Sequence, residues 1–478
     1  MAETLWTASE LSGLYGAAAI SGDLPEAAGG VSIDTRTLQP GDVFFAIKGE
    51  RTDGHNYVGQ AFEAGASVAV VECSYSGAAQ GPLIRVDDTL EAMAALGRAA
   101  RERSRARIVA VTGSVGKTST KEMLRLMLGR IGRVHASDKS YNNHWGVPLS
   151  LARLPRDADY AVFEIGMNHA GEIVPLTKMV RPHAAIITTV GPVHIEFFDS
   201  VEAIAEAKAE IFEGVEPGGA AILNRDNEHF GLLAERAGEA RISRIVSFGR
   251  ENGADAALTA FEAQPDGSRV QADCLGESMT YQVGARGEHL AMNSLAALAA
   301  VKILGGDVHE AAPALAEFGA PAGRGAQTVH VIDGGSFRLI DEAYNANPAS
   351  MNAAFAVLGS FPREAAARRV AVLGDMRELG ALSDALHEGL AAGIAAAEID
   401  TVYCCGPHMA ALFAALPLAR RGAWAEKAED LKDILLAEIR AGDAVMIKGS
   451  LGSRMGPIVD AIKQKFPHCE PAAKPAAA

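Results

Sequence analysis

The sequence lacks long apolar runs and has few cysteines, and each absence excludes a class of protein. No run reaches the roughly 18 apolar residues that a membrane span needs, so we expect no membrane span. The first ten residues, MAETLWTASE, lack the basic and apolar regions of a secretory signal. The cysteines are odd in number and show no metal-site spacing, so ordinary packing in a reducing cytoplasm is the preferred interpretation. They are Cys73, Cys274, Cys404, Cys405 and Cys469.

An excess of positive charge is also missing. The 44 basic and 59 acidic residues give a formal net charge of −15, which argues against general nucleic-acid binding. An acidic protein that binds polyphosphates must do so through a local site. The length of 478 residues suggests about three domains, and 49% hydrophobic with 22% charged residues is typical of a soluble globular protein. We therefore expect a cytoplasmic enzyme.

Residues 107–122, RIVAVTGSVGKTSTKE, combine a short apolar strand, a glycine turn and the start of a helix. The turn's glycines let backbone N–H groups converge on an anion, Lys117 can reach the β- and γ-phosphates, and the Thr118 hydroxyl can ligate Mg²⁺. The full pattern has a glycine where this chain has Val111, and a glycine turn with a chance Gly-Lys-Thr is the alternative. Because strand and helix flank the turn as the motif requires, we predict a nucleotide site. Its residues are Thr112, Gly113, Ser114, Val115, Gly116, Lys117, Thr118 and Ser119.

Strands alternate with helices along most of the chain, which predicts an α/β protein with parallel sheets and ligands at the carboxyl ends of the strands. We predict an amphipathic helix over 287–304, a β-rich insert over 250–285, and a second doubly wound sheet after the turn at 321–325. Other predicted strands are 43–47, 68–71, 161–166, 184–190 and 219–224, with helices at 56–64 and 89–103. The predicted domains are 1–87, 88–322 and 323–478, with a disordered tail over 470–478.

Several polar residues follow predicted strands of the central domain. Glu164 stands where P-loop enzymes hold Mg²⁺ or its waters, and an exposed strand-end carboxylate is the alternative. His194 follows another strand with Thr188 before it, although a lone histidine is more often structural. Both lie near the place where the phosphate-binding turn must open.

Lys208 lies inside an apolar stripe at helical spacing. In SVEAIAEAKAEIFEGV it falls four residues after Ile204 and three before Ile211. A desolvated amine loses its proton readily, and a neutral amine can react with CO₂ to form a carbamate that binds metal. A lysine that snorkels out of the stripe is the alternative.

Other candidate residues carry weaker signals. Arg324, beside glycines at the second boundary, could reach the γ-phosphate as an arginine finger. Asp341 ends a strand in IDEAYNANPASM, and His289 and Asn293 are spaced to share one helix face that suits a nucleotide base. Polar stretches at 34–36 and 48–55 lie in loops at strand ends, where either ligand contacts or surface turns are expected.

Taken together, these stretches resemble the Mur ligases, the ATP-dependent amide-forming enzymes of peptidoglycan synthesis. The resemblance covers nearly the whole chain in family order, and its motifs are TGSVGKTSTKE, NNHWGVPLSL, EIGMNHAGEI, TTVGPVHIEFF, EAKAEIF, GEHLAMNSLAA, Gly323-Arg324, DEAYNANPASM, VLGDMRELG and IKGS. Thr-Ser-Thr-Lys-Glu, Tyr-Asn-Ala-Asn-Pro and Leu-Gly-Asp-Met-Arg-Glu-Leu-Gly are similar to the branch that joins D-alanyl-D-alanine to UDP-N-acetylmuramoyl-tripeptide. The usual arginine after Lys-Gly-Ser is replaced by Leu451, and Arg454 follows three residues later, which leaves open which arginine meets the incoming carboxylate.

The resemblance implies a role for each candidate residue. The first domain would hold the UDP end of the substrate, the central one is a P-loop ATPase domain, and the third is Rossmann-like. Substrate contacts would be Asp34, Thr35, Arg36, Lys48, Asp53, Gly54, His55, Asn142 and Asn143. ATP contacts would add His289, Asn293, Arg324, Asp341, Tyr344 and Asn345 to the P-loop. The catalytic set would be Lys117, Glu164, His194, Lys208, Arg324 and Asp341, with Thr118, Glu164, His194 and carbamylated Lys208 at Mg²⁺ or Mn²⁺.

The resemblance also implies a mechanism, and two alternative functions stay open. ATP would convert the substrate carboxylate to an acyl phosphate, which the dipeptide amine attacks after the third domain closes on the second. We expect a monomer with small-molecule partners and no nucleic acid. A folylpolyglutamate synthase-like ligase shares the architecture, and a P-loop NTPase that makes no bond is the rival from another class.

Overall fold

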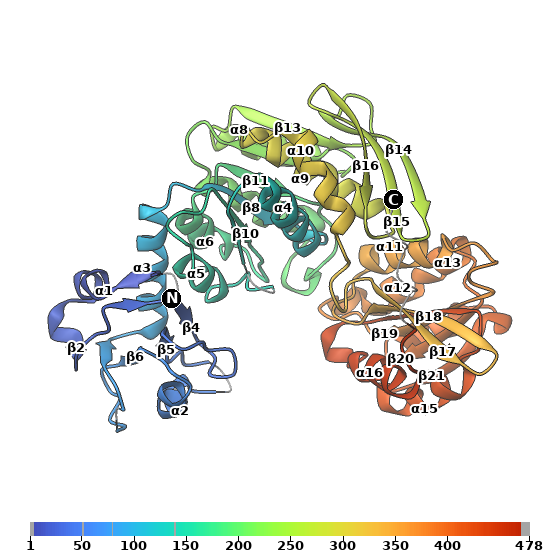
Figure 1. The fold of residues 1–478 in the computed structure, drawn as a ribbon. Coiled ribbons are helices and arrows are strands. Elements are labelled where there is room, and N and C mark those ends of the chain that lie inside the picture. Colours follow the sequence, from blue (N-terminus) through green and yellow to red (C-terminus); the bar gives the residue numbers. More distant parts are fainter. Residues whose placement is uncertain (1–3, 50–51, 79, 138–139, 470–478) are drawn as a thin grey trace, which may run out of the picture.

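The computed structural model describes residues 4–49, 52–78, 80–137 and 140–469. The predicted tail at 470–478 lies outside these residues. Three larger sheets follow one another along the chain and form an arch, with the central sheet at its top (Figure 1). In the described part of the chain, no helix has the length and apolar character that crossing a membrane requires. The mixed α/β architecture agrees with the sequence prediction.

The first sheet has the order β2-β7-β6-β5-β4 and is parallel except for β2 against β7. The helix expected at 89–103 is confirmed as α3 (Thr89–Arg103), which Asp88 caps with its side chain. The helix expected at 56–64 is shorter and follows a 3₁₀ turn at Gly54–Tyr57. The other elements are β1 (Trp6–Thr7), α1 (Ala8–Tyr15), β2 (Ile20–Ser21), β3 (Ala27–Ala28), β4 (Gly30–Ser32), β5 (Asp42–Phe45), α2 (Val58–Glu63), β6 (Val68–Glu72) and β7 (Leu83–Val86).

The central sheet has the order β16-β15-β14-β13-β12-β11-β8-β10-β9. Its strands are β8 (Arg107–Thr112), β9 (Val134–Ala136), β10 (Tyr160–Glu164), β11 (Ala184–Ile187), β12 (Ala220–Asn224), β13 (Arg244–Gly249), β14 (Ala256–Gln264), β15 (Gly267–Cys274) and β16 (Glu277–Val283). The helices are α4 (Lys117–Ile131), α5 (Gly146–Ala152), α6 (Ile173–Val180), α7 (Val201–Ala209), α8 (Phe230–Glu239), α9 (Glu288–Ile303) and α10 (Val308–Ala311). The P-loop strand β8 lies between β10 and β11, all parallel, so their carboxyl ends meet at one edge.

Two expectations for this domain are wrong in part. The β-rich segment is not a separate insert, because β14 pairs with β13 and extends the same sheet with two antiparallel strands. Helix α9 is not amphipathic, since its residues from Asn293 to Val301 are all buried. It packs against α4 and against β13 to β15, so apolar neighbours surround it.

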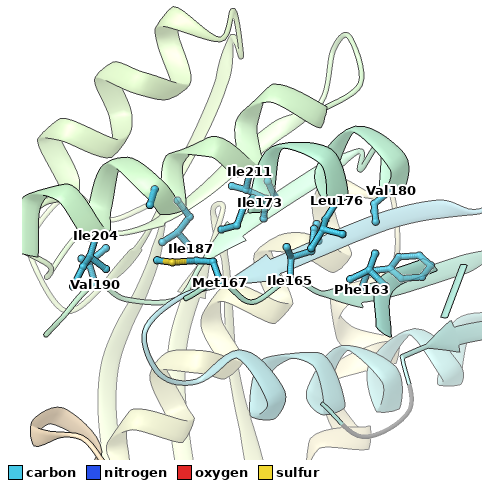
Figure 2. Close-up of a cluster of buried hydrophobic side chains, with 14 of the residues drawn as sticks. Phe163, Ile165, Met167, Ile173, Leu176, Val180, Ile187, Val190, Ile204 and Ile211 are labelled. Atoms are coloured by element: carbon cyan, nitrogen blue, oxygen red, sulfur yellow. The ribbon is translucent and has the colours of Figure 1, made fainter. Parts of the chain in front are cut away.

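Apolar side chains fill the space between the central sheet and α6 and α7. Figure 2 shows Ile204 and Ile211, from the predicted stripe around Lys208, in the same cluster as Ile173 and Ile187. All four are fully buried. This packing fixes α7 against the sheet and with it the position of Lys208.

The third sheet has the order β17-β18-β22-β19-β20-β21 and is parallel except for β17 against β18. The expectation that helices separate all its strands is wrong, because β17 (Ala326–Ile332) and β18 (Gly335–Glu342) form a hairpin. Strand β21 (Arg421–Ala425) was not expected. The remaining elements are α11 (Pro348–Gly359), β19 (Arg368–Gly374), α12 (Ser383–Glu388), α13 (Leu390–Ala396), β20 (Thr401–Cys405), α14 (Met409–Ala415), α15 (Ala428–Glu438), β22 (Asp443–Lys448) and α16 (Gly456–Lys465).

Candidate active site

The turn between β8 and α4 needs its two glycines. Gly113 has φ +146°, and a Cβ there would lie 1.9 Å from the Thr188 hydroxyl oxygen of the neighbouring strand end. Gly116 has φ +88°, and a Cβ there would lie 2.8 Å from the Asn293 amide oxygen. The turn therefore packs closely against β11 and α9 while its backbone N–H groups stay at a helix N-terminus, the geometry of an anion cradle.

Lys117 is the first residue of α4 and turns back over the cradle. Its Nζ donates to the Gly113 carbonyl oxygen at 2.6 Å. Burial lowers the pKa of Lys117, the Glu164 carboxylate partly offsets that effect, and the Arg324 guanidinium lowers it further. A polyphosphate in the cradle would supply the negative charge that this amine needs.

Glu164 ends β10 as a buried carboxylate with 1% exposure. One of its oxygens accepts from the Thr118 hydroxyl at 2.9 Å and the other from the Asn142 amide at 2.8 Å. Among the described residues, no cluster of three His, Cys, Asp or Glu side chains could hold a metal. A single carboxylate with a hydroxyl nevertheless fits Mg²⁺ in a nucleotide site, because phosphate oxygens and waters complete its octahedron.

Lys208 lies in the last turn of α7 and is only 3% exposed. Burial, and then the positive charge of Lys117, lowers the pKa of its amine well below the usual value. The alternative of a lysine that snorkels to the surface is therefore wrong. The amine therefore lies close enough to Lys117 for the two positive charges to repel each other.

Arg324 reaches the cradle from the segment that leads into the third sheet. Its Nη2 donates to the Ser140 hydroxyl at 3.3 Å, and Ser140 lies 3.5 Å from the Thr118 hydroxyl. The guanidinium lies over the Tyr344 ring, 4.3 Å from its centroid. Thr118, Ser140, Arg324 and Tyr344 together line a cavity of about 500 Å³. Sequence reasoning missed Ser140, since an isolated serine in a loop carries no signal.

Three predicted nucleotide contacts do not meet the cradle in this arrangement. The buried Asp341 carboxylate accepts from the Ala343 amide at 3.2 Å and lies 3.5 Å from Lys463 Nζ, within the third domain. Asn345 accepts a bond from Lys448 through its backbone oxygen at 3.0 Å. His289 is exposed, although Asn293, four residues later, touches Gly116.

His194 does not point toward Glu164 but faces the third domain. It has a left-handed backbone, and its ring forms an ion pair with Glu378 of the segment after β19. The pair lines a cavity of about 700 Å³ between the central and third domains. Sequence reasoning missed Glu378, for which the only signal was an acid shortly after a predicted strand.

The predicted substrate residues fall into two groups. In the first domain, Arg36 pairs with Asp34 at 2.6 Å and half-buried Thr35 lies between them. Asp53 caps the turn that begins at Gly54, and its carboxylate lies 2.7 Å from the His55 ring. The backbones of Asp53 and Lys48 form an isolated antiparallel β-bridge. Asn142 and Asn143 belong to the central domain instead: Asn142 holds Glu164, and Asn143 accepts from the Gly146 amide at 3.0 Å at the start of α5.

Known protein families match most of the chain. Family models match residues 28–101 as the Mur ligase family catalytic domain, 111–301 as the Mur ligase middle domain and 329–451 as the Mur ligase glutamate ligase domain. The UDP-N-acetylmuramoyl-tripeptide–D-alanyl-D-alanine ligase of Rickettsia prowazekii is 33% identical over 430 residues, 90% of this chain and 94% of that protein.

Solved structures give the same result. A crystal structure of MurF from Acinetobacter baumannii superposes with a TM-score of 0.81 at 30% identity, covering 96% of this chain and 99% of that one. MurF from Thermotoga maritima in complex with ADP superposes with a TM-score of 0.76 at 25% identity, over 91% and 97%. The chain belongs to the Mur ligase family.

Proposed function

We propose that the chain is an ATP-dependent ligase that adds D-alanyl-D-alanine to UDP-N-acetylmuramoyl-tripeptide, the step that forms the pentapeptide precursor of peptidoglycan. The observation that carries the proposal is the convergence of Lys117, Glu164 and Lys208 on one glycine cradle, in a chain similar from end to end to ligases of that name. The enzyme would act as a cytoplasmic monomer on small molecules.

The reaction needs an activated carboxylate. ATP transfers its γ-phosphoryl group to the tripeptide carboxylate to give an acyl phosphate and ADP. The dipeptide amine then attacks the acyl carbon, and the tetrahedral intermediate expels phosphate to leave the amide. Lys117 and the backbone N–H groups of the cradle stabilise the charge that moves during the first step.

Thr118 and Glu164 would hold Mg²⁺, or Mn²⁺ in its place, together with phosphate oxygens. When bound, the metal neutralises charge on the phosphates. In this proposal Asn142 keeps the Glu164 carboxylate oriented, and His194 joins the metal shell once it leaves Glu378.

Lys208 would be carbamylated in the active enzyme. The ammonium first loses one proton, and the neutral amine then adds to CO₂ and releases a second, so that a cation in the apolar stripe becomes a carbamate anion. The lowered pKa supports this assignment because only the neutral amine reacts. The new carboxylate would also compensate the charge of Lys117 beside it.

The remaining roles follow the three proposed domains, 1–87, 88–322 and 323–478. Asp34, Thr35, Arg36, Lys48, Asp53, Gly54 and His55 would contact the UDP end of the substrate, with Asn143 nearer the peptide. Arg324 would meet the γ-phosphate, while Asn293, His289, Asp341, Tyr344 and Asn345 would contact the nucleoside. For Asp341 this requires the third domain to move toward the cradle.

A ligation assay tests the proposal. Purified protein receives Mg²⁺–ATP, UDP-N-acetylmuramoyl-tripeptide and D-alanyl-D-alanine, and each substrate is omitted in turn. We expect phosphate release and product only with all three. Phosphate released at the full rate without the two acceptor substrates would instead indicate an NTPase that makes no bond. Ligation of glutamate to a folate would indicate a folylpolyglutamate synthase-like ligase.

A further inference from the structure

The cavity of about 700 Å³ between the central and third domains has no assigned ligand. Its volume lies within the range of roughly 300–1,000 Å³ that small-molecule sites occupy. One wall comes from the loop after β11, which contains His194, and the opposite wall comes from the loops after β19 and β22. The carboxyl ends of parallel strands thus surround the cavity, as in other α/β sites.

Some of the charged side chains that face this cavity have a partner of opposite charge, and others do not. His194 and Glu378 pair with each other, which holds the pKa of Glu378 below its usual range. His408 pairs with Asp384, and Glu196 is exposed. Arg377 is the single lysine or arginine among the described residues that line the cavity, and no described carboxylate pairs with it.

The Arg377 guanidinium keeps most of its donors free. Its Nη2 reaches only the Gly452 carbonyl oxygen, at 3.4 Å. The backbone beneath it is held firmly: the Arg377 amide donates to Ser450 Oγ at 3.0 Å, and the Met376 amide donates to the buried ring of His387 at 2.9 Å. An exposed cation on a fixed loop is suited to bind an anion that arrives with a substrate.

We propose that Arg377 binds the C-terminal carboxylate of the dipeptide acceptor and so orients its amine toward the cradle. This inference rests on the proposed function. Ala346, Leu379 and Leu451 line the cavity beside the guanidinium and offer apolar contacts to the two methyl side chains of the dipeptide. An extended dipeptide spans about 7 Å, and residues 193–196 of the central domain line the same cavity, so its amine can face that domain while its carboxylate meets Arg377.

Arg454 is the obvious competitor, and its position argues against it. It lines a different cavity, of about 570 Å³, on the far side of the loop that contains Gly452. That loop places Leu451, which is 69% exposed, on the wall of the first cavity. Arg377 borders both cavities and, among the described residues, is the only lysine or arginine that lines the one that also contains His194.

The test compares two acceptors, D-alanyl-D-alanine and its C-terminal amide, at saturating ATP and UDP-N-acetylmuramoyl-tripeptide. The wild type should prefer the acid by roughly 10- to 100-fold in kcat/KM, the range for one charge-assisted contact. Arg377→Gln should reduce this preference to about threefold or less, mainly through KM for the acid, and Arg377→Lys should restore part of it. KM for the other two substrates should not change.

Arg454→Gln is the matched control and should keep the wild-type preference. A full acid preference in Arg377→Gln, or its loss in Arg454→Gln, would overturn the inference while leaving the proposed function intact. A raised KM for UDP-N-acetylmuramoyl-tripeptide alone would place Arg377 on the donor peptide and also overturn it. A wild type that ligates neither acceptor would refute the proposed function and this inference with it.

Discussion

The residues around the cradle carry more positive charge than the carboxylates beside them neutralise. Lys117, Lys208 and Arg324 gather around a cradle in which Glu164 is the main opposing charge. Burial lowers the pKa of both lysines, and a positive neighbour lowers it further, Arg324 for Lys117 and Lys117 for Lys208. A bound polyphosphate would favour the protonated form of Lys117, and the proposed carbamate would remove the positive charge of Lys208.

Loss of the Lys117 charge should abolish most of the activity. We expect Lys117→Ala to lower kcat by on the order of 10²-fold or more, as removal of a preorganised charge does. Lys117→Met keeps the length of the side chain and should lose as much, because the charge is what matters. Steady-state ligation kinetics measure both, and near-normal turnover in either variant would refute the cradle assignment.

Replacement of Lys208 should be severe but partly reversible. In Lys208→Ala we expect little activity in buffer and partial recovery with a small carboxylate such as acetate, which can take the place of the carbamate. Lys178→Ala is the control, since that lysine is exposed on neighbouring α6 and pairs with Glu213. It should keep its activity with or without acetate. Full activity of Lys208→Ala without any carboxylate would contradict the carbamate.

At the scale of elements, the site depends on how closely the P-loop packs against its neighbours. The turn after β8 touches β11 through Gly113 and α9 through Gly116. A Cβ at either glycine would have to displace a side chain of the neighbouring element. The cradle therefore depends on the end of β11 and on α9 as well as on its own motif.

Gly113→Ala tests this dependence. Its Cβ would collide with the Thr188 hydroxyl, so we expect the free energy of unfolding to fall by about 1–3 kcal/mol and nucleotide affinity to drop. Gly171→Ala is the matched control, because Gly171 also has a positive φ, +86°, but a Cβ there meets nothing within 4 Å. Denaturant unfolding and ADP titration measure both effects. If both variants lose the same stability and the same ADP affinity, backbone strain alone explains the effect and the contact with Thr188 does not matter.

Local patterns predicted the parts of the fold and site that local residues decide. The bounds of α3, the P-loop turn and the burial of Lys208 follow from caps, glycines and apolar spacing. The patterns failed where distant segments decide: helix α9 is surrounded by strands that its own sequence does not reveal. The His194–Glu378 pair likewise joins residues that only the arrangement of domains brings together.

At the scale of the molecule, we expect the arch to change shape during the proposed reaction. Asp341 lies in the third domain away from the cradle, while its backbone oxygen accepts from Gly325, next to Arg324 in the segment that joins the two domains. We expect the hinge to lie in that segment. Acyl phosphates hydrolyse in water, so closure around the 700 Å³ cavity would protect the intermediate before the amine attacks.

Small-angle X-ray scattering can detect this closure. A compact chain of this length would have a radius of gyration of about 23 Å, and we expect the free protein to exceed that value because its three domains form an arch (Figure 1). A non-hydrolysable ATP analogue with UDP-N-acetylmuramoyl-tripeptide should lower the radius toward 23 Å, since in the proposed function each ligand contacts more than one domain. The ATP analogue alone is the control and should have a smaller effect. An unchanged radius with both ligands, at concentrations that saturate binding, would mean that the domains do not close and that Asp341 has no part in the nucleotide site.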